Sequence, residues 1–324
     1  MEQAKEKEKP EKRKKGFVRR FLEAGFLMLA SAYLAFSVNE ARQWRKHYDF
    51  LENKEGYRQE YMLASLHNHT SHRGDGDKCV YEFLLEAHRQ GYGIVAVTDH
   101  EDRTLDYCAG VSISRLEELA LAGSGFFGCP DSGGFEVAKV NETTYKVTRE
   151  GDEHALYVLA GAEITALYYG RPVHVLGIGL SKVPESHQSL EKTLIELKSQ
   201  GALIGAPHAT SRIFKSIRAK GVKEFQDFFD FVEINGMYAF PQRAILNFTA
   251  KRLGKRLGIP MVAAPDSHIR GQYFNRTLVM VEKCDSFDEK DIVGFLRRQF
   301  DAGNYRNIVS IPESGVIYHW HLFK

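Results

Sequence analysis

The chain has 324 residues, of which 43% are hydrophobic and 27% are charged, and its formal net charge is +2. This length allows one large domain or two ordinary ones, and the apolar fraction is sufficient to bury a core. The nearly balanced charge argues against a general polyanion-binding protein, so we expect no duplex nucleic acid as a partner. The cysteines form no CxxC pair, which excludes a zinc-finger spacing.

The N-terminal part of the chain differs in composition from the rest. Residues 1–20 are rich in lysine, arginine and glutamate, which predicts a disordered basic tail. Residues 21–38 form an apolar segment interrupted only by Glu23, and its uncharged part is shorter than the roughly 20 residues of a usual membrane span. Residues 39–60 then have the pattern of a polar helical connector.

Three interpretations of residues 21–38 are open. The first is a signal anchor, because basic residues crowd its N-terminal side; the catalytic domain would then be membrane-anchored and extracytoplasmic. The second is a cleaved signal peptide, with Ala30-Ser31-Ala32 as the cleavage site. The third is an amphipathic or buried helix of a soluble, cytoplasmic protein. The membrane tether is our first expectation.

From Tyr61 onward, short apolar runs alternate with helical patterns. The runs are "YMLASLHNH", "GIVAVTDH", "LYVLAGAEIT", "PVHVLGIGL", "ALIGAPHAT", "DFVEINGMY" and "PMVAAPDSH", and helix candidates include residues 80–90, 114–122, 188–200 and 241–257. This alternation predicts parallel strands with helical crossovers, arranged as a barrel or as a large doubly wound sheet. Residues 110–152 interrupt it, and we predict an insertion there, with a β-hairpin near the rim of the active site.

Chemically useful side chains stand at the ends of the apolar runs. The candidates are His67, His69, His100, Glu163, His174, His208, Asp266 and His268. In parallel α/β folds the C-terminal ends of the strands meet at one edge, where sites form. Because side chains alternate along a strand, His67 and His69 point to one side, as do Asp266 and His268.

Imidazoles combined with carboxylates suit zinc, manganese or iron. The candidates are too many for one four-coordinate ion and suit two or three divalent metal ions, with a carboxylate such as Glu163 bridging neighbours. Such a cluster produces a hydroxide at neutral pH and stabilises both the attacking and the leaving oxygen. The reaction that it suits best is the hydrolysis of a phosphate ester.

The motifs "HNH", "VTDH", "GAEIT", "HVLGIG", "PH" and "PDSH", in this order, resemble the polymerase and histidinol phosphatase (PHP) superfamily. The resemblance covers roughly residues 63–268. It implies an α/β fold, a distorted (β/α)7 TIM-like barrel of the PHP type, with a trinuclear metal centre at its C-terminal face. Residues 61–324 would then be a PHP metal-hydrolase domain that contains the insertion 110–152.

The resemblance also implies three sets of ligands. One ion would bind His67, His69, Glu163 and Asp266, and a second would bind Glu163, His174 and His208. A third would bind His100, His268 and one residue that follows the HxH motif, either Asp75 of "RGDG" or His72. We expect Asp75. Asp99 is predicted to orient a ligand, and Glu233 is either a further supporting residue or simply the end of a strand.

The motif combination is most similar to the stand-alone phosphoesterases of the superfamily, which implies a phosphatase acting on a small phosphorylated substrate such as a nucleotide. Arg212 and Arg270 follow ligand-bearing strands, and each can neutralise phosphate charge or form a surface salt bridge. The alternatives are a nuclease acting on oligonucleotide phosphodiesters, an amidohydrolase-type enzyme acting on C–N bonds, and a non-catalytic membrane-tethered binding module.

Overall fold

The computed structural model describes residues 45–71, 75–122, 134–212, 214–236, 242–268 and 277–309, together with isolated helical positions between Phe26 and Arg42. The chain divides into two compact units, Met1–Arg42 and Gln43–Lys324, and the second contains every element named below. Most of the apolar segment 21–38 lies outside the described residues, so its role as an anchor, a signal or a soluble helix stays a prediction. Within the described part of the chain, no helix combines the length and the apolar character that crossing a bilayer requires.

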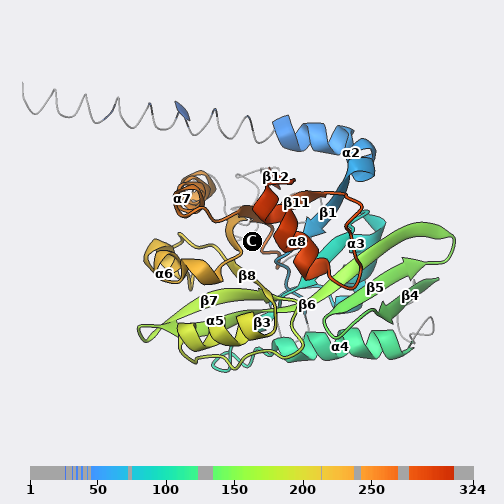
Figure 1. The fold of residues 1–324 in the computed structure, drawn as a ribbon, viewed down its shortest axis with the longest axis horizontal. Helices are drawn as coiled ribbons and strands as arrows, with labels where there is room; N and C mark the ends of the chain where they lie inside the picture. The colour runs from blue at the N-terminus through green and yellow to red at the C-terminus, as the bar shows by residue number, and fades with distance from the viewer. Residues whose placement is uncertain are drawn as a thin grey trace, which may run out of the picture. The chain divides into compact units, whose positions relative to one another are not determined.

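The unit Gln43–Lys324 is built around one sheet of twelve strands, drawn as arrows in Figure 1. Nine strands follow the order β10-β9-β8-β7-β6-β2-β1-β11-β12, while β3 and β5 pair with β6 and β4 pairs with β5. The strands are β1 (Tyr61–Ser65), β2 (Ile94–Val97), β3 (His100–Glu101), β4 (Phe135–Lys139), β5 (Thr144–Arg149), β6 (Asp152–Tyr168), β7 (Arg171–Ile178), β8 (Leu203–Ala206), β9 (Phe231–Asn235), β10 (Met261–Ala264), β11 (Thr277–Glu282) and β12 (Tyr305–Val309).

Helices connect most of the parallel strands. They are α2 (Lys54–Glu60), α3 (Val80–Arg89), α4 (Ala109–Ala122), α5 (Leu190–Ser199), α6 (Arg218–Glu224), the short 3-10 helix η2 (Gln226–Phe228), α7 (Gln242–Leu257) and α8 (Ile292–Ala302). The four predicted helices correspond to α3, α4, α5 and α7, and the seven predicted strands correspond to β1, β2 and β6 to β10. The predicted hairpin is present as β4 and β5, which pair antiparallel.

The two ends of the strand order meet, because side chains of β12 bind the backbone of β10. The N–H of Ala263 donates to Oδ1 of Asn307 at 2.6 Å, and Nδ2 of Asn307 donates to the carbonyl oxygen of Met261 at 2.7 Å. The N–H of Met261 donates to the hydroxyl of Tyr305 at 3.1 Å. The fold is therefore mixed α/β with a nearly closed, barrel-like sheet.

The sheet is not as uniformly parallel as the alternation of runs predicted. Strand β7 runs antiparallel to both β6 and β8, and β11 runs antiparallel to β1 and β12. The reason at β7 is its short connection to β6 through Tyr169 and Gly170, whose φ angles are 49° and 72°. Positive φ at two successive residues is typical of a tight hairpin turn, which joins only antiparallel strands.

The core inside this sheet positions the functional residues. Leu159 of β6, Leu176 of β7, Phe231 of β9 and Val262 of β10 belong to one buried cluster with apolar residues of α8. Glu163 lies four positions after Leu159, Glu233 lies two after Phe231, and His174 lies two before Leu176, so alternation along these strands directs all three inward. Asp266 lies beyond the end of β10, where its φ angle of 50° sets its direction instead.

Candidate metal centre

The structure brings together all nine side chains that we predicted as metal ligands. They are His67 and His69 after β1, Asp75 in the following segment, His100 in β3, Glu163 in β6, His174 in β7, His208 after β8, and Asp266 and His268 after β10. Eight of them fall into three overlapping groups, in each of which the possible ligand atoms lie within 4.8 Å of one another: His67, His69, Glu163 and Asp266; His69, Asp75, His100 and His268; His100, Glu163 and His174. The ninth, His208, contacts Glu163.

Glu163 lies at the centre of the cluster and is 1% exposed. Its Oε1 atom is 2.8 Å from Nδ1 of His174 and 2.9 Å from Nε2 of His208. Its Oε2 atom faces a different set: Nε2 of His67 at 3.2 Å, Nε2 of His69 at 3.4 Å and Nδ1 of His100 at 3.1 Å. A carboxylate that directs its two oxygens at two sets of imidazoles has the arrangement of a bridging ligand.

The donor atoms of the first group fit a cation. Nε2 of His67 and Nε2 of His69 are 3.1 Å apart, and Oδ1 of Asp266 is 3.4 Å from each. Nδ1 of His67 faces a carboxylate oxygen of Glu233 at 3.1 Å. In the neutral form that binds a metal ion, this contact places the proton on Nδ1 and leaves a lone pair on Nε2. Lone pairs that converge in a buried place repel one another unless a positive charge lies among them. This set therefore matches the requirements of a metal ion.

Asp75 lies with His100 and His268, the two histidines whose third partner the sequence left open between Asp75 and His72. Its Oδ2 atom is 3.2 Å from Nε2 of His268 and 3.5 Å from Nε2 of His100. The next residue, Gly76, passes so close to His69 that an added Cβ would lie 2.3 Å from the carbonyl oxygen of His69. Only glycine permits this approach. The alternative ligand, His72, lies outside the described residues.

The charges of the cluster shift the pKa values of its members. Burial raises the pKa of Glu163, but the neighbouring imidazoles, His174 first, bring it well below its usual 4.5. Burial lowers the pKa of His69 to about 3, and the charge of His100 adds to this effect. Near pH 7 the carboxylate is therefore ionised and this imidazole is neutral, which are the forms that bind metal ions.

His174 enters the cluster from the beginning of a strand and not from its end. In the antiparallel pair of β6 and β7, His174 lies opposite Thr165, two residues beyond Glu163. The start of β7 is therefore at the same edge of the sheet as the end of β6. The sequence marked His174 as a candidate ligand, and its ring lies against Glu163. The parallel arrangement that we expected for this strand was wrong.

His208 and Asp266 have an unusual backbone conformation. Their φ angles are 34° and 50°, and each follows a proline, Pro207 or Pro265. A residue other than glycine in this region costs on the order of 1 kcal/mol or more, so such residues cluster where the surrounding structure imposes them. Each of these two residues lies just after a strand, β8 or β10, and its unusual conformation turns its side chain toward the cluster.

Two buried polar residues hold the HxH segment in place. Asn68, between the two histidines, donates from Nδ2 to the carbonyl oxygens of Ser65 at 3.0 Å and Ala96 at 2.9 Å. Asp99 accepts hydrogen bonds from the N–H and the hydroxyl of Thr70. Asp99 was predicted to orient a ligand; its hydrogen bonds hold the residue that follows His69, and the role itself stays a prediction. The role of Asn68 was missed, although its position inside the motif was a signal.

Of the two arginines predicted to bind phosphate, only Arg212 is among the residues that the structure describes. Arg212 is exposed and lies four residues after His208, in the segment that follows β8. Arg270 lies outside the described residues. Their contact with a substrate stays a prediction.

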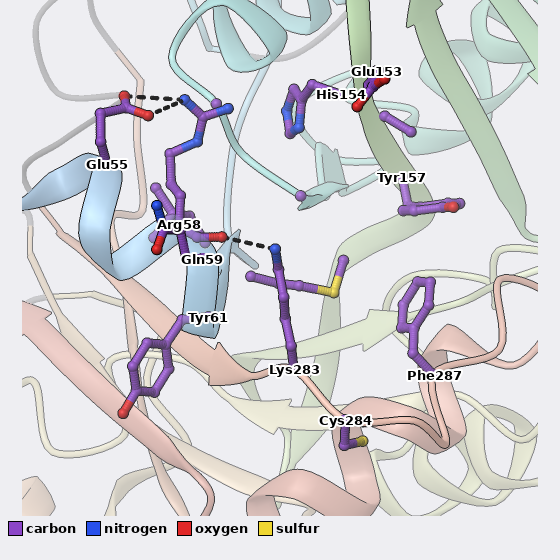
Figure 2. A pocket seen from close by; sticks show the side chains of 15 residues that line it. Glu55, Arg58, Gln59, Tyr61, Glu153, His154, Tyr157, Lys283, Cys284 and Phe287 are labelled. Carbon is purple, nitrogen blue, oxygen red and sulfur yellow. Dashed lines mark hydrogen bonds and ion pairs between the residues drawn. The ribbon is translucent and has the colours of Figure 1, made fainter.

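A separate cavity of about 650 Å³ lies near the start of β1 and is shown in Figure 2. Three of its charged groups have partners inside the protein: Nη1 of Arg58 is 3.1 Å from Oε2 of Glu55, and Nζ of Lys283 donates to the carbonyl oxygen of Arg58 at 2.7 Å. None of the nine predicted ligands lines it. We therefore assign it no part in the metal centre.

Comparison with known proteins gives a match at the level of structure. No protein-family model and no curated protein matches the chain. A two-domain protein from Bacteroides vulgatus, described as containing a predicted PHP-like metal-dependent phosphoesterase, matches 77% of this chain with a TM-score of 0.51 and 17% sequence identity. The chain has a PHP-like fold. The match spans 65% of the Bacteroides protein, and at this identity it establishes the fold alone.

Two further structures match more weakly. One is an amidohydrolase from Chromobacterium violaceum with bound sulfate and no metal, at 12% identity and a TM-score of 0.42 over 68% of this chain and 92% of that one. The other is described as a metal-dependent phosphoesterase from Bifidobacterium adolescentis, at 13% identity and a TM-score of 0.41 over 73% and 94%. Neither is similar enough to support an argument. The Bacteroides match confirms the PHP-like fold that the order of the motifs indicated.

Proposed function

We propose that this protein hydrolyses a phosphate ester of a small substrate with the help of divalent metal ions. The observation that carries this proposal is the position of Glu163, whose two oxygens face two different sets of histidines at 2.8 to 3.4 Å. Carboxylate-bridged pairs of metal ions are typical of enzymes that displace an oxygen at phosphorus. The PHP-like fold supports the same reaction class.

The ligands divide into three sets when each imidazole serves one ion. His67, His69, Glu163 and Asp266 form the first; Glu163, His174 and His208 form the second; Asp75, His100 and His268 form the third. In this division only Glu163 is shared, which a carboxylate allows and a neutral imidazole does not. Zinc, manganese and iron are the candidates for this combination of nitrogen and oxygen ligands. Divalent ions supply an activated water and positive charge for the phosphate oxygens.

Side chains of the protein would exclude water from the cluster and bind the phosphate group. The buried histidines and carboxylates exclude bulk water from one side of the cluster, since all but Asp75 and His268 are less than 9% exposed. Arg212 follows His208 on the exposed side and is our candidate for binding the phosphate, with Arg270 as the second. Two arginines are enough to bind one phosphate group, so we expect a substrate with a single phosphate ester.

The test combines metal analysis with a substrate panel. The purified full chain is freed of metal with a chelator and reloaded with zinc, manganese or iron. Turnover is then measured on a phosphomonoester, a phosphodiester and a cyclic amide. We expect hydrolysis of phosphate esters that requires metal, and no hydrolysis of the amide. Hydrolysis of the amide alone would identify a C–N hydrolase instead.

Glu163→Gln and His154→Gln form a matched pair, because both residues lie on β6. Gln at position 163 places an NH2 group against one set of histidines. Replacing a partner of a metal ligand costs about 10- to 100-fold in activity, so for a shared ligand we expect turnover to fall by more than about 100-fold. His154 contributes to none of the three groups, so the second variant should retain wild-type turnover. Unchanged turnover in Glu163→Gln would refute the proposal.

A further inference from the structure

Glu233 points into the protein beside the metal centre although it belongs to none of the predicted ligand sets. It lies on β9, two residues after Phe231, whose side chain packs in the interior cluster. Alternation along the strand directs Glu233 and Asn235 to the same face. Both are 1% exposed. A buried carboxylate is costly unless it is well hydrogen-bonded, so its partners define what it does.

One oxygen of Glu233 contacts two predicted ligands from different strands. Oε2 is 3.1 Å from Nδ1 of His67, the nitrogen on the far side of the ring from the cluster. The same oxygen accepts the backbone N–H of His208 at 3.0 Å. The first contact sets the tautomer and the orientation of the His67 ring. The second holds the strained residue that follows β8.

The other oxygen of Glu233 is connected to a third ligand through Asn235. Nδ2 of Asn235 donates to Oε1 of Glu233 at 2.7 Å and to Oδ2 of Asp266 at 2.9 Å. The backbone of Asn235 is held in turn by the side chain of Asn247 on α7, which accepts its N–H at 3.0 Å and donates to its carbonyl oxygen at 2.9 Å. Asn235 therefore has little freedom to follow a displaced partner.

We propose that Glu233, with Asn235, is a positioning residue that aligns His67, His208 and Asp266 for metal binding. The inference rests on the proposed function in that it takes these three side chains as metal ligands. His67 and Asp266 belong to the first ligand set and His208 to the second. One buried carboxylate would therefore orient ligands of two neighbouring ions. Partners of this kind fix the ring orientation of a ligating histidine and raise its basicity.

Glu233→Gln tests this role with little change of shape. The carboxylate now accepts on both oxygens: from His67 and His208 on one, and from Asn235 on the other. A Gln amide has an acceptor at only one end, so either orientation places its NH2 group against another donor. We expect zinc affinity, measured by competition with a chromogenic chelator, to fall by about 10- to 100-fold.

Two further readouts separate positioning from general stability. The Nδ1–H proton of His67 should give a slowly exchanging signal in ¹H–¹⁵N NMR spectra of the zinc-loaded protein, and Glu233→Gln should shift or remove it. Asn235→Ala removes the hydrogen bonds to Oε1 of Glu233 and to Oδ2 of Asp266 but keeps the contact of Oε2 of Glu233 with His67. It should therefore weaken zinc binding less while leaving this signal in place. Asp230→Asn is the control, since Asp230 precedes β9 and binds Arg297 and the N–H of Ile204. It should lower thermal stability without changing zinc affinity.

The proposal is overturned if Glu233→Gln binds zinc as tightly as the wild type. It is also overturned if Asp230→Asn loses as much zinc affinity as Glu233→Gln. If Glu233→Gln does not fold, Asn235→Ala decides, and wild-type affinity there would overturn the proposal. None of these measurements uses a substrate. A wild-type chain that binds zinc but hydrolyses no phosphate ester would therefore contradict the proposed function and leave the role of Glu233 standing.

Discussion

The carboxylate of Asp75 lies 3.2 Å from Nε2 of His268, although the two residues are far apart in the sequence, one before β2 and the other after β10. Backbone hydrogen bonds hold them there: the N–H of Asp77 donates to the carbonyl oxygen of His268 at 2.9 Å, and the N–H of Gly76 donates to that of Thr70 at 3.2 Å. The segment after the HxH motif is thereby fastened to the segment after β10. The position of Asp75 between His100 and His268 therefore follows from the backbone hydrogen bonds of the two residues after it.

Replacing Asp75 tests whether this group holds an ion of its own. Asp75→Ala removes the carboxylate that His100 and His268 share, while the first two ligand sets keep all their members. We expect the number of metal ions per chain, measured by elemental analysis after gel filtration, to fall by one. Glu163→Gln, which affects both other sets, should lose more. Unchanged metal content in Asp75→Ala would point to another ligand, with His72 the next to be replaced.

Removing the metal should destabilise the protein, because the predicted ligands lie in six different strands or in the segments that follow them. A ligand that binds only the folded state stabilises it by about 2.7 kcal/mol when its free concentration is 100 times its Kd. We expect chelation to lower the Tm of the wild type and metal to restore it. The double variant His67→Ala/His69→Ala should show no such response and no metal-dependent turnover. An equal rise of Tm with metal in both proteins would place the binding site elsewhere.

Asn307 should contribute to stability without affecting the metal centre. Its amide replaces a strand partner for β10, at 2.6 Å from the N–H of Ala263 and 2.7 Å from the carbonyl oxygen of Met261. Asn307→Ala leaves both backbone groups without this partner, which costs on the order of 1 to 3 kcal/mol. Urea unfolding should show this loss, while zinc affinity stays at the wild-type value. A loss of zinc affinity of 10-fold or more would mean that the closure also shapes the site.

The pH dependence of stability should depend in part on His154. Burial lowers the pKa of its ring below the ordinary value of 6.5, and the charges of His88 and Arg58 add to this, against smaller opposite effects of the Tyr92 carbonyl and Asp152. The folded state therefore favours the neutral ring, and the unfolded chain binds the extra proton first as the pH falls. This contribution to stability is complete above about pH 6.5 and is lost as the pH falls further.

His154→Gln removes this titration and keeps a donor for the carbonyl oxygen of Tyr92, which Nε2 of His154 contacts at 2.9 Å. Plotted against pH, the Tm of the variant should fall less steeply than that of the wild type as the pH drops below about 6.5. Above about pH 7 the difference between the two proteins should be constant. Parallel curves over the whole range would show that His154 does not titrate with the expected shift.

Much of the candidate site was visible in the order of residues along the chain. Histidines and carboxylates at the ends of apolar runs marked the candidate ligands, because a strand presents alternate side chains to one face and its end lies at the edge of the sheet. The pair of His67 and His69 could be predicted in this way from five consecutive residues. The spacing of Asp75 was less informative, because its position depends on the loop that Gly76 permits.

By itself, the sequence determined the types of ligand, their order and the α/β character of the domain, since these follow from local periodicity. Only the tertiary structure decided that β12 closes the sheet against β10 and that Glu233 contacts His67 and His208. Each of these depends on hydrogen bonds between residues far apart in the chain. The order and direction of strands select such pairs, and no local pattern of residues encodes that choice.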